Sequence, residues 1–299
     1  MLISIIITTR NSSSYIKKTL DAIVSQTFQS YEVLVIDDAS DDISELTKII
    51  ENYSAIITIR VIKQRTKTNA SVTRNIGIKN SIGEIICFLD ADDIWRENKL
   101  EVVAKVFDDF KNESTIVFHQ SLRGTLNDIN AGKGKIVPET GPATNNIVDY
   151  LMNEHGVIQT STISINRKSA EILVFDESLP RHQDIQFCFD AYKNKVNFIF
   201  VEQILSNWII LDRASNAHTK GANVDFCLGW INKNRSVLTD KNIVNYLSNV
   251  LFLIAIKEKA FFRTIPISVA LLGCNSLIAW RKFFILVFSR VLKVFKRKS

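Results

Sequence analysis

The stretch ICFLDADDIW, residues 86–95, starts with four apolar residues and then places three carboxylates within four positions, at Asp90, Asp92 and Asp93. A short apolar run that stops at a polar turn is typical of a buried strand in a parallel sheet. We predict this strand over residues 84–89. Similar apolar or β-branched runs bounded by polar turns predict strands at residues 2–8, 31–36, 56–62 and 115–118.

Helical patterns separate these runs. The first follows the cap-competent segment Asn11–Ser14, and others cover about residues 43–51, 70–80 and 100–110. Strand and helix therefore alternate four times over about 120 residues. This alternation predicts the α/β class, with an open, mostly parallel sheet and helices on both of its faces.

Polar and charged residues follow each of the first four predicted strands. They are Thr8, Thr9, Arg10 and Asn11 after the first, Asp37 and Asp38 after the second, residues 65–74 after the third, and Asp90, Asp92 and Asp93 after the fourth. Ligands bind outside the carboxyl ends of the strands in open α/β sheets. We therefore predict a binding site at this edge.

The pair Asp90 and Asp92 is spaced by one residue, so an extended turn can present both carboxylates on one side. Hard oxygen ligands suit Mg²⁺ or Mn²⁺, and a metal held by one or two carboxylates takes further ligands from water and a substrate phosphate. A diphosphate donor would fit. The alternative is that the acids only cap the next helix and favour its dipole, which is our interpretation of Asp93.

The net charge of +6 comes from one end of the chain. Residues 281–299 hold seven of the 37 basic residues and no acidic residue, which leaves 30 basic against 31 acidic residues in the rest. A basic protein often binds nucleic acid, but here the excess is confined to a tail that also carries Phe283, Phe284, Phe288 and Phe295. We therefore predict no nucleic-acid partner.

Several function classes lack their sequence signals. The four cysteines lie far apart without a CxxC pair, which argues against a zinc cage or a disulfide framework and fits a reducing cytosol. The chain contains no GxGxxG, GxxxxGK[ST], HExxH or GxSxG motif. The apolar run at residues 2–7 is too short for a secretory signal and lacks a basic flank, so we expect a cytoplasmic protein.

The second half of the chain is less regular. Residues 119–146 contain the Gly and Pro of a long loop, a candidate lid or acceptor loop, and further strands are predicted near residues 161–166 and 196–201. From about Phe226 onward only helical patterns occur. We therefore expect an α/β domain that carries the binding site at residues 1–220 and a helical region at residues 221–299.

The tail predicts contact with a membrane surface. As a helix, residues 281–299 would place Phe284, Phe288 and Phe295 on one face and basic side chains on another, as in helices that lie in the membrane interface. Residues 265–280 are apolar but are shorter than the about 20 residues that a spanning helix needs. Peripheral attachment is therefore favoured over a spanning segment, and a core helix with a solvated basic end is the main alternative.

Three segments together carry a family resemblance. SIIITTRNSSSYIKKTLDAIVSQTF (4–28), YEVLVIDDASDD (31–42) and TRNIGIKNSIGEIICFLDADDIW (73–95) occur in one order and spacing. This pattern resembles the family 2 glycosyltransferases with a GT-A fold, closely over residues 1–100 and more loosely to about residue 215. One departure is Asn69, where many relatives have Gly, so the path of that loop needs the structure.

The resemblance implies transfer of a sugar from a nucleotide diphosphate donor, with inversion at the anomeric carbon and with Mn²⁺ or Mg²⁺ as cofactor. The roles that it implies by position are these: Thr8 and Arg10 beside the base, Asp38 accepting from the uracil imide, Arg74 near the nucleotide, Asp90 at the ribose and Asp92 on the metal.

Inverting transfer also needs a carboxylate that takes a proton from the acceptor hydroxyl. The segment FDESLPRHQDIQFCFDAYKN (175–194) offers Asp184 at the start of a predicted helix, at a place where the family carries its base in a pair usually written ED. We predict Asp184 as the base, with a helix-leading carboxylate as the alternative. His182 is a candidate for orienting the base or touching the acceptor, or is incidental.

Relatives often close a later segment over the donor diphosphate. Here the corresponding residues are Trp208, Arg213, Ser215 and His218, with a plain surface loop as the alternative. An Arg with a Ser would supply hydrogen-bond donors to phosphate oxygens.

The predicted function is therefore an inverting, metal-dependent hexosyl or N-acetylhexosaminyl transferase that uses a UDP-sugar. Its acceptor would be a saccharide linked to polyprenyl diphosphate, used in surface polysaccharide (O-antigen or capsule) synthesis at the inner face of the cell membrane. Two alternatives stay open: an inactive relative that acts as a membrane-bound scaffold, and a nucleotidyltransferase, although no basic Gly-rich loop follows the first strand.

Overall fold

The computed structural model describes residues 1–110, 113–154, 156–211 and 223–285. The chain divides into two compact units. One comprises residues 1–147 and 156–214, and the other comprises residues 148–155 and 215–299. The domain boundary predicted at residue 220 lies outside the described residues.

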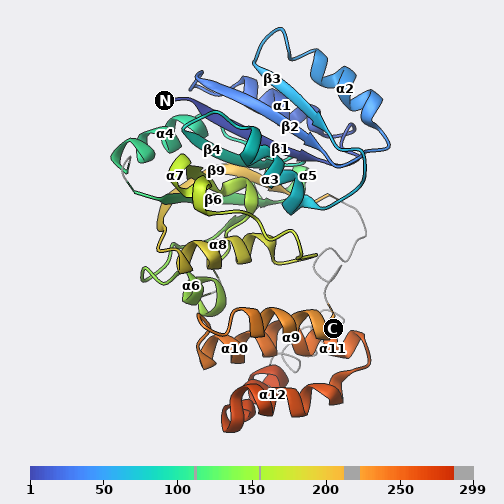
Figure 1. Cartoon of the computed structure of the whole chain (residues 1–299), viewed down its shortest axis with the longest axis vertical. Helices are drawn as coiled ribbons and strands as arrows, with labels where there is room; N and C mark the ends of the chain where they lie inside the picture. Colours follow the sequence, from blue (N-terminus) through green and yellow to red (C-terminus); the bar gives the residue numbers. More distant parts are fainter. Residues whose placement is uncertain (111–112, 155, 212–222, 286–299) are drawn as a thin grey trace. The chain divides into compact units, whose positions relative to one another are not determined.

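A nine-stranded sheet forms the first unit, with the order β3-β2-β1-β4-β8-β6-β9-β5 and with β7 paired to β6 (Figure 1). Strands β3, β2, β1 and β4 are parallel, as are β6 and β9, whereas β8, β5 and β7 pair antiparallel. The strands are β1 (Ile3–Thr9), β2 (Tyr31–Asp37), β3 (Ile59–Lys63), β4 (Ile85–Asp90), β5 (Ile94–Trp95), β6 (Thr115–Gly124), β7 (Lys135–Val137), β8 (Ser164–Asn166) and β9 (Asn197–Ile209). The predicted α/β class is confirmed.

Helices cover both faces of this sheet. Their bounds are α1 (Ile16–Val24), α2 (Ile43–Glu51), α3 (Ala70–Asn80), α4 (Lys99–Asp109), α5 (Leu126–Asn130), α7 (Arg167–Ile172) and α8 (Gln183–Lys193). Apolar side chains of α1, α2 and α4 share one core cluster with Ile3, Ile5 and Ile7 of β1. On the other face, Phe88 of β4 meets Phe187 of α8, with ring centroids 6.1 Å apart.

The alternation of side chains along β1 explains this two-sided packing. Successive residues of a strand point to opposite faces, and every position of β1 from Ile3 to Ile7 is buried. Ile5 and Ile7 lie in the core cluster of α1, whereas the side chain of Ile6 lies against Gly77 of α3. A side chain at position 77 would overlap Ile6, so this glycine lets α3 approach the sheet closely.

Two segments differ from the sequence prediction. The third strand starts at Ile59 rather than residue 56, because Ile56 and Ile57 donate their backbone N–H groups to the carbonyl of Tyr53 and close a turn. The predicted loop at residues 119–146 is largely ordered, since β6 continues to Gly124 and is followed by α5 and β7.

The second unit is helical in its described part. Its helices are α6 (Ile147–Asn153), α9 (Val224–Lys233), α10 (Asp240–Tyr246), α11 (Phe252–Lys257) and α12 (Thr264–Leu272). Stacked rings join α9 to α10, with centroids 5.1 Å apart for Trp230 and Tyr246, and Phe252 of α11 stacks on Trp280 at 4.3 Å.

One helical stretch, Thr264–Ile285, is long and apolar enough to cross a membrane by length and composition alone. It has 22 residues, and 28% of its most apolar window is buried within the protein. The sequence predicts an apolar segment at residues 265–280, and in the structure the helical stretch continues to Ile285.

The close contact between α3 and β1 can be tested with Gly77→Ala. The added methyl group would overlap Ile6, and overpacking of this kind costs about 1–3 kcal/mol of the free energy of unfolding. We expect the melting temperature of the first unit to fall by several degrees in a thermal unfolding scan. The control is Gly229→Ala in α9, where an added Cβ meets no atom within 4 Å, and which should leave or raise the stability. Equal melting temperatures for Gly77→Ala and the unmodified protein would contradict this account.

Candidate functional site

A cavity of about 470 Å³ opens at the carboxyl ends of β1, β2 and β4. All six residues that the sequence predicted for the nucleotide and the metal line it, namely Thr8, Arg10, Asp38, Arg74, Asp90 and Asp92. The loops after parallel strands bring them together from positions up to 84 residues apart. We refer to this space as the polar cavity.

The two acids that end β2 have different surroundings. Asp37 is buried, and its carboxylate accepts hydrogen bonds from Thr9 Oγ1 (3.2 Å) and from the backbone N–H of Ser40 (3.0 Å). It therefore stabilises the turn after β2. Asp38 lines the polar cavity, and its Oδ1 accepts from Thr68 N (2.6 Å) and Thr68 Oγ1 (2.7 Å). These bonds fix the side chain of Asp38 against the loop that precedes α3.

Arg10 ties the ends of β1 and β2 together. Its Nη1 donates to the backbone carbonyls of Asp38 (2.7 Å) and Ala39 (3.3 Å), while its side chain lines the polar cavity. The guanidinium is therefore held in place before any ligand binds.

Asn69 resolves the departure from the family pattern. It is the N-cap of α3, in extended backbone with φ −156°, and its Oδ1 accepts from Ser71 N (2.9 Å) and Val72 N (3.2 Å). Its Nδ2 donates to the carbonyl of Glu177 at 2.9 Å. This backbone conformation does not require glycine, and the amide side chain caps the helix that carries Arg74.

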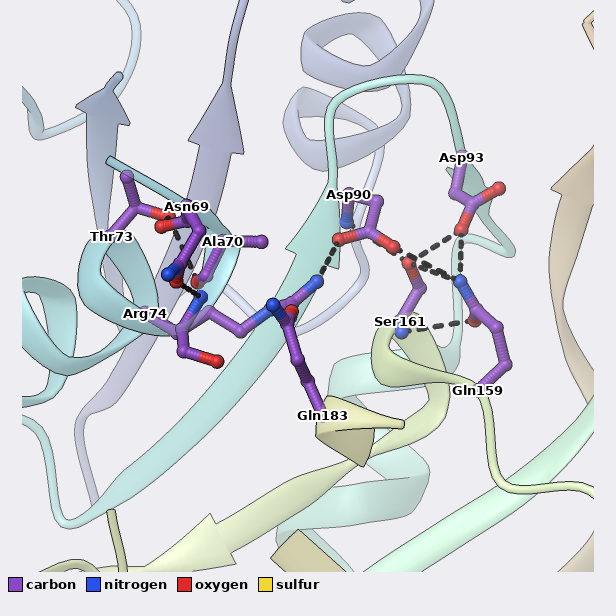
Figure 2. A network of polar contacts seen from close by, with 10 residues as sticks. Asn69, Ala70, Thr73, Arg74, Asp90, Asp93, Gln159, Ser161 and Gln183 are labelled. Atoms are coloured by element: carbon purple, nitrogen blue, oxygen red, sulfur yellow. Dashed lines mark hydrogen bonds and ion pairs between the residues drawn. The ribbon is translucent and has the colours of Figure 1, made fainter. Parts of the chain in front are cut away.

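Arg74 joins three parts of the site, as Figure 2 shows. Its guanidinium donates to Asp90 Oδ1 (2.9 Å) and to Gln183 Oε1 (3.1 Å), and it lies 5.2 Å from the ring centroid of Phe175. The side chain is only 8% exposed. A charge-assisted pair of this kind orients both the arginine and the Asp90 carboxylate.

Asp93 is not the helix-leading carboxylate that the sequence suggested. It is 1% exposed, β5 follows it, and the next helix, α4, starts at Lys99. Its carboxyl group meets three donors: Ser161 Oγ (2.6 Å), Gln159 Nε2 (2.7 Å) and the backbone N–H of Ile209 (3.0 Å). Burial, with the charges of Asp90 and Asp92, raises the pKa of Asp93 well above its usual value.

The loop that carries Asp92 is held from two sides. Thr19 Oγ1 of α1 lies 2.8 Å from the carbonyls of both Ala91 and Asp93. On the other side, Gln159 Nε2 reaches Asp90 Oδ2 (3.3 Å) as well as Asp93 (Figure 2). The position of Asp92 between these anchors is therefore set by the protein itself.

The residues present fit a divalent metal ion that takes part of its ligands from the protein and the rest from a substrate and water. Both oxygens of Asp90 contact protein donors, Arg74 and Gln159, and the neighbouring Asp92 lines the same cavity. Within the described ranges no group of three or more His, Cys, Asp or Glu is arranged to hold one. A metal here would therefore take most of its ligands from water and phosphate oxygens, as Mg²⁺ commonly does.

Asp184 lies in the first turn of α8, next to Gln183, which lines the polar cavity. Its Oδ1 accepts from the backbone N–H of Ile185 at 2.9 Å. Burial raises the pKa of Asp184, the charge of Arg74 lowers it, and the charge of Asp90 raises it. Asp184 itself does not line the polar cavity, although Arg74 and Asp90, whose charges act on its pKa, do.

His182 has a left-handed backbone with φ 62° and is buried. Burial and the charge of Arg181 lower its pKa to about 3, so its ring is neutral at physiological pH. Trp208 of β9 packs its ring against Arg123, whose guanidinium carbon lies 4.8 Å from the ring centroid. Neither His182 nor Trp208 lines the polar cavity. The predicted residues Arg213, Ser215 and His218 lie outside the described residues.

The sequence prediction missed several residues of this site. Gln183 could have been found, because it precedes the predicted base by one position. Thr19, Gln159 and Ser161 carry no motif, and their partners in the acidic loop are 66 to 74 residues away along the chain.

Comparisons with known proteins agree on the family. The sequence profile of Glycosyl transferase family 2 matches residues 4–171. The amylovoran biosynthesis glycosyltransferase AmsB of Erwinia amylovora is 32% identical over 250 residues, which are 81% of this chain and 81% of AmsB. The chain spans only 27% to 31% of the next curated relatives that it matches.

Two solved structures share the fold. Staphylococcus aureus TarS 1–349 in complex with UDP-GlcNAc has a TM-score of 0.60 at 19% identity, covering 95% of this chain and 78% of that one. The mannosyltransferase PcManGT of Pyrobaculum calidifontis, in complex with GDP-Man and Mn²⁺, has a TM-score of 0.55 at 15% identity, covering 99% and 81%. With the profile match and the similarity to AmsB, these findings show that the chain belongs to glycosyl transferase family 2 and is a glycosyltransferase.

Proposed function

We propose that this glycosyltransferase moves a sugar from a UDP-sugar to a saccharide acceptor, with inversion at the anomeric carbon and with the help of Mn²⁺ or Mg²⁺. The observation that carries the proposal is the polar cavity, in which Thr8, Arg10, Asp38, Arg74, Asp90 and Asp92 meet. TarS, which shares the fold, binds UDP-GlcNAc, and this supports a uridine nucleotide and a hexosyl or N-acetylhexosaminyl group.

The nucleotide would bind along the carboxyl ends of β1 and β2. The carboxylate of Asp38 would accept the imide N–H of uracil, and Arg10 and Thr8 would lie beside the base. Asp90, which is already oriented by Arg74, would accept from a ribose hydroxyl. A uracil imide is a single donor, so one fixed carboxylate can distinguish it from a base that presents an acceptor there.

Asp92 would hold the metal, whose remaining ligands would come from the donor diphosphate and water. When bound, the metal would stabilise the negative charge on the departing diphosphate. The Mn²⁺ in PcManGT supports this assignment by similarity of fold.

Asp184 would be the general base. The acceptor oxygen attacks the anomeric carbon, the bond between that carbon and the diphosphate oxygen breaks, and the hydroxyl proton passes to the Asp184 carboxylate. The nucleoside diphosphate leaves from the opposite face, so the configuration inverts. The raised pKa of Asp184 makes its carboxylate a better proton acceptor than a solvated aspartate.

The similarity to AmsB, named for amylovoran biosynthesis, supports a role in surface polysaccharide synthesis. An acceptor linked to polyprenyl diphosphate would require the enzyme to work at the inner face of the cell membrane. Apolar residues of the second unit would form that contact together with the predicted tail at residues 281–299. They are Phe262, Ile265, Val269, Leu277, Ile278, Phe284 and Ile285, which are 45% to 80% exposed.

The charge of this region supports an anionic membrane. No acidic residue follows Glu258, whereas nine Lys or Arg residues do. Basic residues near a bilayer surface gain about 1 kcal/mol each from anionic lipids. Arg281 and Lys282 belong to the described helical stretch, whereas the other five basic residues of the tail, from Arg290 onward, lie outside the described residues.

The base assignment predicts that Asp184→Asn lowers kcat by about 100-fold to 10,000-fold, because an amide cannot accept the proton. The readout is release of UDP from UDP-GlcNAc with Mn²⁺, with water as acceptor, while the donor KM stays close to that of the unmodified enzyme. The activity of the unmodified enzyme should fall as the pH drops through the raised pKa of Asp184. The residual activity of the variant should not show this decrease at low pH.

Asp190→Asn is the matched control for this test. Asp190 lies on the same helix, six residues after Asp184, and its Oδ1 contacts Gln186 (2.9 Å) and Lys193 (3.4 Å) rather than residues of the polar cavity. It should keep nearly full activity. An Asp184→Asn enzyme with normal kcat would rule out the proposed base.

The metal assignment predicts that Asp92→Ala loses the metal-dependent part of UDP binding. We expect affinity with Mn²⁺ to fall by roughly 100-fold, since even outer-shell partners of a metal contribute 10–100-fold. Binding in EDTA should not change. A thermal-shift titration measures both, because a ligand that binds only the folded state raises the melting temperature.

The same titration with GDP and dTDP sugars tests the choice of uridine. The exposed Glu97 near the acidic loop supplies the control variant Glu97→Ala, which should keep the Mn²⁺ effect. If Asp92→Ala kept the full Mn²⁺ effect, the metal would lie elsewhere.

The membrane contact predicts cosedimentation of the full chain with vesicles that contain anionic phospholipid. The double variant Phe262→Gln/Leu277→Gln should lower the bound fraction several-fold, because these two side chains are 80% and 72% exposed. Removal of residues 281–299 should abolish the dependence on anionic lipid and on salt.

The matched control for the apolar contact is Ile56→Gln/Ile82→Gln, at sites of the first unit that are 63% and 71% exposed. This variant should bind like the unmodified protein. If Phe262→Gln/Leu277→Gln and the protein without residues 281–299 both bound vesicles as well as this control, neither the apolar residues nor the basic tail would contribute to membrane contact.

A further inference from the structure

A second cavity of about 220 Å³ has a different chemistry from the polar cavity. Five aliphatic residues line it, namely Ile94, Leu126, Ile209, Ile210 and Leu211. Its remaining lining residues are Tyr15, Lys18, Asp92, Thr125 and Asn127. We refer to this space as the aliphatic cavity.

The two cavities meet at Asp92 and Tyr15, which line both. A molecule in the aliphatic cavity would therefore lie next to the carboxylate that we assign to the metal. The nucleotide-binding residues Arg10, Asp38 and Arg74 do not line the aliphatic cavity, so it is not a continuation of the nucleotide site.

The wall of the aliphatic cavity is built into the sheet. Ile209 donates its backbone N–H to Asp93 Oδ1 (3.0 Å), and Ile210 donates its own to the carbonyl of Gly124 (2.8 Å). Ile94 pairs with Asn207 across β5 and β9. The aliphatic side chains are therefore held open beside the acidic loop, and Ile210 is still 39% exposed.

Lys18 supplies the only cation among the lining residues of the aliphatic cavity. It is exposed on α1, and it forms no ion pair with any residue that the structure describes. An aliphatic wall with one ammonium group at its edge suits a molecule that joins an apolar chain to a phosphate. The hydrogen-bonding side chains of Tyr15, Thr125 and Asn127 also line this cavity and would contact the sugar of such a molecule.

We propose that the aliphatic cavity binds the apolar chain of an amphiphilic acceptor, with Lys18 contacting the phosphate that joins this chain to the acceptor sugar. This inference rests on the proposed function and adds to it the subsite that selects the acceptor. The contact places the apolar chain of the acceptor beside Asp92, in the cavity that Arg10, Asp38 and Arg74 do not line. It also accounts for aliphatic side chains that stay partly exposed beside a site for polar substrates.

The test is binding of farnesyl phosphate to the full chain in the presence of UDP and Mn²⁺, with farnesol and inorganic phosphate as separate probes. Leu126→Gln and Ile210→Gln should each weaken farnesyl phosphate binding by roughly tenfold, the effect of losing one buried aliphatic contact. Lys18→Ala should remove the preference for farnesyl phosphate over farnesol.

Three controls separate this site from other parts of the protein. Ile82→Gln and Lys105→Ala change exposed residues outside the aliphatic cavity and should have no effect. Phe262→Gln/Leu277→Gln in the second unit reports any binding of the chain to the proposed membrane contact. UDP release from UDP-GlcNAc by the same samples reports the proposed function independently.

Loss of farnesyl phosphate binding in Leu126→Gln and Ile210→Gln, with UDP release retained, would support the subsite. The proposal is overturned if these variants bind farnesyl phosphate normally, if only Phe262→Gln/Leu277→Gln weakens it, or if the unmodified protein does not bind it. Absence of UDP release from the unmodified protein would instead contradict the proposed function.

Discussion

The site depends on the hydrogen bonds that the buried carboxyl group of Asp93 accepts. Its two oxygens connect the acidic loop to β9 through Ile209 and to the turn at residues 159–161 through Gln159 and Ser161. Burial of an acid beside two other carboxylates is costly unless donors satisfy it, and three donors do so here. The same contacts therefore position Asp92 and the aliphatic wall that starts at Ile209.

Much of the fold could be predicted because its signals are local. The apolar runs at β1, β2 and β4 predicted a sheet, and the carboxyl-end rule placed Thr8, Arg10, Asp38 and Asp90 at one edge, where the polar cavity lies. This rule needs only the order of the strands. Gln183, which accepts a hydrogen bond from Arg74, lies 109 residues later in the sequence. Its contact with Arg74 depends on how α8 packs against the sheet, which the strand order does not predict.

The sequence prediction failed where buried polar residues form part of the sheet. Residues 119–121 resemble a loop, yet they continue β6, because Ser121 pairs with Ser206 and Gln120 Nε2 donates to the carbonyl of Glu139. Asp93 was misinterpreted for the same reason. A buried polar side chain is stable only with a partner, and a partner distant along the chain leaves no mark on the local pattern.

The position of Asp92 between two cavities explains why the acidic loop needs so many anchors. In the proposed reaction, the donor diphosphate and the acceptor would approach this residue from different sides, and misplacement by about 1 Å can cost 100-fold in rate. Thr19 holds the loop on the side of α1, and Gln159 holds it on the side of the turn at residues 159–161. An acidic loop that the protein itself fixes can orient the polar donor and the acceptor with its apolar chain relative to each other. Its conformation then does not depend on either substrate being bound.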